Sequence, residues 1–182
     1  MLTSNYYAWK DMAFRLYKSP AHSSITENIN TEIKDAGGTK IVITPYCDPG
    51  YSKENIAGSA TAYWDNARLQ GGLSIDFGDD SSVVTYETYN PATIGISDRS
   101  VSTTPSFNGE ERYIFVCNGR NKSSSSKTIT KVLFYKNIYT KNANNGYDTV
   151  NGTAFIFSID LDEPVVVGSN SSFSITTEMV IS

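Results

Sequence analysis

The feature that most constrains the fold is a succession of short segments after Gly38, each rich in β-branched and aromatic residues. Gly, Asn, Asp or Pro separates one segment from the next. Hydrophobic and polar residues alternate in several of them, as in residues 73–77, with the two-residue period of a strand. Such closely spaced strands are typical of sandwiches and barrels. We therefore predict an all-β fold: a single antiparallel β-sandwich, jelly-roll or immunoglobulin-like, with a short N-terminal α-helix.

The predicted strands are residues 40–44, 59–64, 73–77, 83–89, 93–96, 112–117, 128–135, 153–159, 165–167 and 173–181. Polar segments at residues 118–127 and 141–152 are predicted to be hairpin connections. Because side chains alternate across a strand, the pattern also predicts which residues point inward. These are Leu73, Ile75, Phe77, Phe115, Cys117, Ile129 and Leu133.

A strong helical pattern occurs at the N terminus, where Thr3 or Ser4 can cap an apolar stripe that includes Trp9. A weaker helical stretch is predicted over residues 26–34. We expect residues 1–38 to form a helical or extended arm and residues 39–182 to form the β-sandwich domain. The stripe either covers one end of a sheet or anchors the chain in a neighbouring subunit. We predict that deleting residues 1–17 leaves the sandwich soluble and weakens its incorporation into a larger assembly.

The charge pattern argues against several classes of function. The net charge is −4, and the basic residues between Arg112 and Lys136 are interrupted by Ser and hydrophobic residues, as on the solvent face of a strand pair. We therefore expect no nucleic-acid partner. A single histidine, His22, excludes multi-histidine metal sites and argues against His-based acid–base catalysis. No signal-peptide pattern or membrane-spanning run is present, so we expect folding in a cytoplasm and no membrane partner.

Cysteines and carboxylates are the remaining candidates for chemistry. Cys47 and Cys117 either form a disulfide in an oxidising compartment or remain buried free thiols. Two acidic groups, Asp76 with Asp79 and Asp80, and Asp160 with Asp162 and Glu163, contain ligand types that calcium prefers. The first group lacks the ligand order of an EF-hand, and Asp is common in turns for its own backbone hydrogen bonds. We therefore predict no catalytic, cofactor-binding or metal-binding residues.

Four segments carry a resemblance to a known group of proteins. They are the opening LTSNYY with its short helix, LSIDFGDDSSVVTYETYN at 73–90, RYIFVCNGRNKSSSSKTITKVLFY at 112–135, and the closing strand pair at 159–181. Together these segments resemble small structural proteins of tailed-bacteriophage virions, over the last three fifths of the chain and the N-terminal helix. The resemblance implies a structural role without catalytic residues.

The leading expectation is a non-enzymatic component of a bacteriophage virion, in the tail, the collar or the capsid exterior. It would be assembled in the host bacterial cytoplasm, with other virion proteins and copies of itself as partners. A surface rich in Tyr, Asn and Ser suits polar, hydrated interfaces. The main alternative is a receptor- or glycan-binding module in which Tyr46, Tyr51, Tyr63 and Trp64 stack on sugars. A third hypothesis is a hydrolase with an atypical site.

Overall fold

The computed structural model describes residues 1–10, 31–46, 62–65, 73–89, 94–107, 111–141 and 148–181. Residues 4–10 are helical. The strands are β1 (Thr31–Lys34), β2 (Lys40–Tyr46), β3 (Ala62–Asp65), β4 (Ser74–Gly78), β5 (Ser97–Phe107), β6 (Glu111–Arg120), β7 (Lys127–Lys141), β8 (Asp148–Val167) and β9 (Ser172–Ile181).

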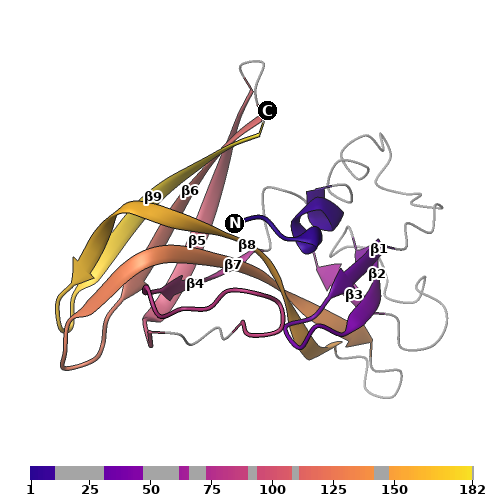
Figure 1. Ribbon diagram of the computed structural model, residues 1–182, viewed down its shortest axis with the longest axis horizontal. Coiled ribbons are helices and arrows are strands. Elements are labelled where there is room, and N and C mark those ends of the chain that lie inside the picture. Colours follow the sequence, from indigo (N-terminus) through magenta and orange to yellow (C-terminus); the bar gives the residue numbers. More distant parts are fainter. Residues whose placement is uncertain are drawn as a thin grey trace.

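The strands form two sheets that pack as a sandwich (Figure 1). Hydrogen-bonded neighbours in the larger sheet follow the order β1-β2-β3-β7-β4. β8 also pairs with β7, on the side of β7 opposite to β3 and β4. The smaller sheet has the order β5-β6-β9. All neighbours are antiparallel except β2 and β3, which are parallel. The predicted all-β antiparallel sandwich with a short N-terminal helix is confirmed.

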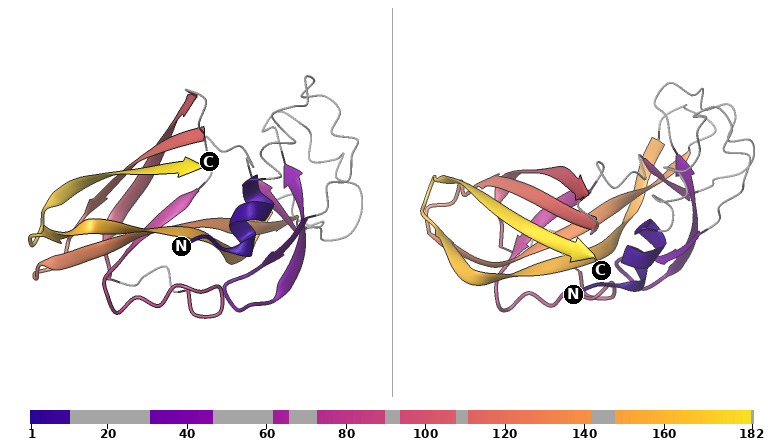
Figure 2. Two further views of the ribbon diagram at one scale, coloured as in Figure 1. Left: turned by 45° about the horizontal axis from the view of Figure 1, so that its top comes forward. Right: turned by 90° about the horizontal axis from the view of Figure 1, so that it is seen from above.

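The long pair β7–β8 forms the centre of the larger sheet and contains three irregularities of register. At the first of them the partner of β7 changes from Val165, opposite Ile129, to Asp160, opposite Lys131. The extra residues of β8 include Pro164, which has no N–H to donate to a strand ladder. Bulges of this kind bend a strand, and Figure 2 shows both strands curving along the whole length of the molecule.

Aromatic side chains from both sheets form the core between them. The ring of Phe115 on β6 lies 4.7 Å from that of Phe134 on β7 and 5.7 Å from that of Phe157 on β8, measured between centroids. A second ring contact between the sheets joins Phe77 on β4 to Phe173 on β9, with 5.0 Å between centroids. These rings join the sheets because each comes from a strand face that points inward.

All the residues predicted to point inward are buried. Leu133, however, belongs to a second cluster, with Tyr89 and Phe155, on the opposite face of the larger sheet. The two-residue period from Ile129 to Leu133 is broken at the bulge beside Lys131, so that Ile129 and Val132 share the main core. Residues 79–89 contribute Val84 and Tyr89 to this second cluster.

The N-terminal helix packs on the main core of its own chain. Trp9 and Tyr6 are almost fully buried, and their rings lie 6.3 Å and 5.8 Å from that of Phe157. Figure 2 shows the helix beside the larger sheet, on the side where the smaller sheet also lies. The apolar stripe therefore covers part of a sheet. Because these side chains belong to the core, deletion of residues 1–17 is expected to unfold the sandwich, contrary to the prediction from the sequence.

Several predicted elements differ from the structure. Residues 31–34 are strand rather than helix, since β1 pairs with β2 from Thr31 opposite Ile43 to Lys34 opposite Lys40. Residues 26–30 lie outside the described part. The expected boundary after residue 38 falls inside this hairpin, where Gly38 adopts a φ of 80°.

Residues 83–89 and 94–96 are not strands. Residues 83–89 form turns, in one of which Thr88 N donates to Thr85 O, and they do not pair with a neighbouring strand. The strands expected at 153–159 and 165–167 are one strand, β8, and β7 and β8 extend into the expected loop at 141–152. No strand was predicted over residues 97–107, which are rich in Ser and Thr, but they form β5.

Candidate interaction surface

Asp76, the first of the carboxylates considered as metal ligands, is fully buried in an ion pair. Its Oδ1 atom accepts a hydrogen bond from Arg99 Nη1 at 2.5 Å and another from the backbone N–H of Phe77 at 2.8 Å. Arg99 comes from β5, so the pair links the two sheets at the β4–β5 edge. Removing one partner of such a pair leaves a buried charge uncompensated, which is strongly destabilising. The contacts of Asp76 thus serve the sandwich itself.

Asp79 and Asp80 lie in the turn that follows β4, and the Asp79 carboxylate shapes that turn. Its Oδ1 atom accepts from Ser81 N at 3.0 Å and from Ser81 Oγ at 2.5 Å. The hydrogen bond from the Ser81 side chain is the main reason why the pKa of Asp79 is lowered. Asp80 is exposed. The predicted turn is therefore present, and the Oδ1 atoms of Asp76 and Asp79 accept hydrogen bonds from separate sets of donors.

The second acidic group lies in the large bulge of β8. Asp160, Asp162 and Glu163 are exposed, and Asp160 has one oxygen 3.9 Å from Lys131 Nζ. Across the residues that the structure describes, no three His, Cys, Asp or Glu side chains gather in a way that could hold a metal ion.

The basic residues of β6, β7 and their connection are mostly on the solvent side, as expected for a strand pair. Arg112 pairs with Glu178 at 2.7 Å, and Lys122 pairs with Asp98 at the same distance. Lys136 departs from the expectation, because only 1% of its surface is exposed. It alternates with Phe134 and Ile138 on β7, and the strand period therefore places it on the buried face.

Other predicted residues are described only in part. Cys117 is a buried free thiol, and burial raises its pKa to about 12. Three further candidates, His22, Cys47 and Tyr51, lie outside the described residues. The remaining aromatic candidates for sugar binding are on β2 and β3, where only the backbone is described: Tyr46, Tyr63 and Trp64.

Exposed strand edges can bind another chain, because their N–H and C=O groups without a partner strand can form hydrogen bonds with it. Four of the edges carry features that hinder such pairing. β1 and β4 are four and five residues long. β5 contains Pro105 and a register irregularity between Ser97 and Ser100. β8 contains the bulge with Pro164, and its edge is partly occupied by the N-terminal segment, since Ser158 N donates to Met1 O at 2.9 Å.

β9 has none of these features. It is ten residues long, contains no proline, and pairs with β6 in unbroken register from Ser172 opposite Arg120 to Ile181 opposite Glu111. Within the described part of the chain, no strand pairs with its other side. Alternate residues of an antiparallel strand direct their N–H and C=O groups to that side. The sequence predicts this strand, but an edge position depends on partners that sequence pattern alone does not identify.

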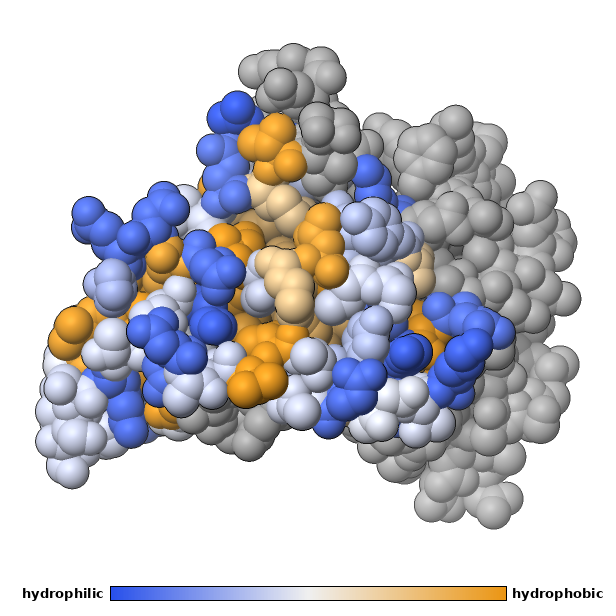
Figure 3. Space-filling model, viewed as in Figure 1, coloured by the Kyte–Doolittle hydropathy of each residue, from blue (hydrophilic) through white to orange (hydrophobic). Residues whose placement is uncertain are grey.

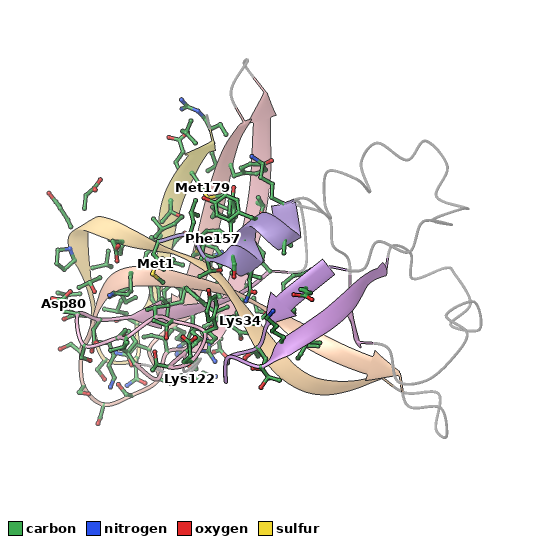
Figure 4. All side chains as sticks on the ribbon, turned by 45° about the vertical axis from the view of Figure 1, so that its right-hand side comes forward. Met1, Lys34, Asp80, Lys122, Phe157 and Met179 are labelled. Atoms are coloured by element: carbon green, nitrogen blue, oxygen red, sulfur yellow. The ribbon has the colours of Figure 1, made fainter. Side chains whose placement is uncertain are left out.

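Three exposed hydrophobic side chains belong to β9 or to the segment beside β8: Val180 is on β9, Leu2 forms a bridge with Phe157 of β8, and Met1 O accepts from Ser158 N. Met1, Leu2 and Val180 are 52%, 46% and 47% exposed. The right-hand view of Figure 2 shows the N terminus and the end of β9 on the same side of the molecule, and Figure 3 shows hydrophobic residues exposed on the face seen in Figure 1. Figure 4 labels Met1, Phe157 and Met179; Met179 packs against the core cluster that contains Phe157, and Met1 O accepts from Ser158 N. We call the free edge of β9 together with Met1, Leu2 and Val180 the open-edge surface.

No helix in the described ranges combines the length and the apolar content needed to cross a bilayer. Comparison with family models, with curated proteins and with solved structures found no match to this chain.

Proposed function

We propose that this protein is a non-enzymatic structural component of a bacteriophage virion, in the tail, the collar or the capsid exterior, and that it acts through protein–protein assembly. The observation that carries the proposal is the open-edge surface. It combines a regular strand, one edge of which has no strand partner among the described residues, with exposed Met1, Leu2 and Val180. Edge pairing supplies backbone hydrogen bonds, and apolar contacts supply further binding energy.

The distribution of edge features supports an assembly role. A sandwich whose edges were all equally open would aggregate in many ways, and natural proteins block such edges with short strands, bulges and proline. Here β1, β4, β5 and β8 carry these features while β9 does not. Among the described strands, one open edge gives a contact of defined geometry, as the subunits of a symmetric assembly require at each interface. The resemblance of residues 73–90, 112–135 and 159–181 to virion proteins points the same way.

Gradient centrifugation of a phage lysate that contains the tagged chain tests this proposal. We expect the chain to sediment with particles, and Val180→Lys to reduce the incorporated fraction by placing a charge in the apolar part of the surface. Val83→Lys is the matched control, because Val83 is 64% exposed and lies in the segment after β4. A wild-type chain that stays at the top of the gradient, or equal loss with both variants, would contradict the proposal.

A further inference from the structure

We propose that the occupant of the open-edge surface is β9 of a second copy of this chain, paired antiparallel about a two-fold axis at Thr176. The inference deepens the proposed function and rests on it for the idea that this surface binds protein. The pairing joins two three-stranded sheets into one continuous sheet with the order β5-β6-β9-β9-β6-β5.

Burial restricts the register of such a pair. Along β9, Ile175 and Thr177 are buried, while Ser174, Thr176 and Glu178 are exposed. Residues directly opposite in an antiparallel pair point to the same face of the sheet. A register that placed Thr176 opposite Thr177 would turn the buried side chains of one copy to the solvent face of the other. The two-fold axis must therefore pass through a residue of β9. Thr176 and Thr177 are the two central residues of this strand, and Thr176 is the one on the exposed face, so we place the axis there.

The register centred on Thr176 matches side chains on both faces. On the exposed face Thr176 lies opposite Thr176 of the second copy, and the hydroxyl of Ser174 lies opposite the carboxylate of Glu178. On the inner face Phe173 lies opposite Met179, both of which are partly buried at the margin of the core. Thr–Thr, hydroxyl–carboxylate and Met–aromatic pairs are all favourable neighbours.

Charge favours a second copy over a strongly charged foreign strand. Glu178 is the single ionisable residue between Ser172 and Val180, and it is already paired with Arg112 on the adjacent strand at 2.7 Å. The edge therefore presents no row of charge that would select an acidic or basic partner. In the proposed register the two Glu178 carboxylates face serines and not each other, so like charges are kept apart.

The test uses the full chain, with oligomeric state measured by sedimentation equilibrium and light scattering over micromolar to millimolar concentrations. We expect the wild type to form dimers. Thr176→Lys places two ammonium groups directly opposite each other, and we expect the variant to be monomeric at concentrations where the wild type is dimeric. Ser174→Lys is the matched control, because it adds the same charge two residues away but places it opposite Glu178. We expect this control to dimerise at least as well as the wild type.

Disulfide trapping tests the register in a Cys47→Ser background, with Cys117 retained because it is buried. Thr176→Cys brings two Cβ atoms opposite each other at Cα separations of about 4.5–5.5 Å, within disulfide range. Ser174→Cys separates the two sulfur-bearing residues by four positions along the strand, roughly 13 Å. We expect oxidation to link the first variant and not the second.

A wild type that is monomeric throughout overturns the inference, as does equal dimerisation of Thr176→Lys and Ser174→Lys, or equal cross-linking of the two cysteine variants. Circular dichroism and melting of Thr176→Lys confirm that its monomer is folded. Particle incorporation separates this inference from the proposed function. A monomeric chain that still enters particles overturns the self-pairing alone, and a dimer that never enters particles overturns the virion role alone.

Discussion

Asn5 offers the sharpest test of how the N-terminal segment is held. Its side chain is fully buried and joins two strands that are distant in sequence. Its Oδ1 atom accepts from Lys34 N at 2.8 Å, and its Nδ2 atom donates to Lys34 O at 2.7 Å and to Phe155 O at 2.9 Å. The perturbation we propose is Asn5→Ala, which removes all three hydrogen bonds without adding bulk.

The expected cost follows from the groups that Asn5→Ala leaves behind. Lys34 loses the side-chain partner of its backbone N–H and C=O, and the C=O of Phe155 loses its bond to Asn5. A buried polar group left without a partner costs roughly 1–3 kcal/mol. Because the bond to Phe155 is buried and the two bonds to Lys34 are only partly buried, we expect a total loss of about 3 kcal/mol in the free energy of unfolding. That is a large part of the 5–15 kcal/mol, roughly, by which a domain is stable.

Urea unfolding followed by far-ultraviolet circular dichroism measures this loss. Tyr7→Ala is the control, because Tyr7 lies two residues further along the same helix with 61% of its surface exposed. We expect the control to cost about 1 kcal/mol or less, because what it removes is one edge-to-face ring contact with Tyr6, 5.2 Å between centroids. If Asn5→Ala costs as little as Tyr7→Ala, the N-terminal segment is not part of the cooperative core and the reasoning is refuted.

Three further predictions concern single side chains. Gly119→Ala places a Cβ atom 2.6 Å from the Phe173 ring, so we expect roughly 1–3 kcal/mol of destabilisation in urea unfolding; an unchanged midpoint would contradict this. The pKa of Asp79 in the folded state is lower than its ordinary value of 3.8, so the ionised carboxylate stabilises the fold at pH values above 3.8. This stabilisation is lost as the pH falls through the lowered pKa. The stability difference between wild type and Asp79→Asn should therefore shrink below about pH 4 in acid-dependent melts, and melting with calcium or chelator should give the same midpoint. Cys117, with its pKa raised to about 12, should resist a thiol reagent at pH 8 until urea unfolds the chain; labelling of the native thiol would count against its burial.

The sequence predicts the fold class because strand periodicity is a local property of the chain. Alternation in residues 73–77 and 112–117 correctly identifies β4 and β6 and the burial of Phe77, Phe115 and Cys117. Turn chemistry at Asp79 is equally local, since its carboxylate bonds to residues two and three positions away.

Local pattern fails where long-range pairing decides the outcome. Residues 31–34 become a strand because β2 is available as a partner, although their local pattern suggested a helix. The same applies to Leu133, whose face depends on a bulge in β8, almost thirty residues further along the chain. Lys136 is buried because the face it shares with Phe134 and Ile138 is covered.

The candidate interaction surface depends on tertiary structure to a greater degree. The alternation of residues 173–181 was sufficient to predict that they form a strand. It could not predict that one edge of this strand has no partner strand in the described part of the chain. Whether a strand is central or at an edge depends on which segments pair on both of its sides, and those segments are remote in sequence. Backbone hydrogen-bonding groups are the same in every residue, so side-chain pattern records the face of a strand but not its edge partners.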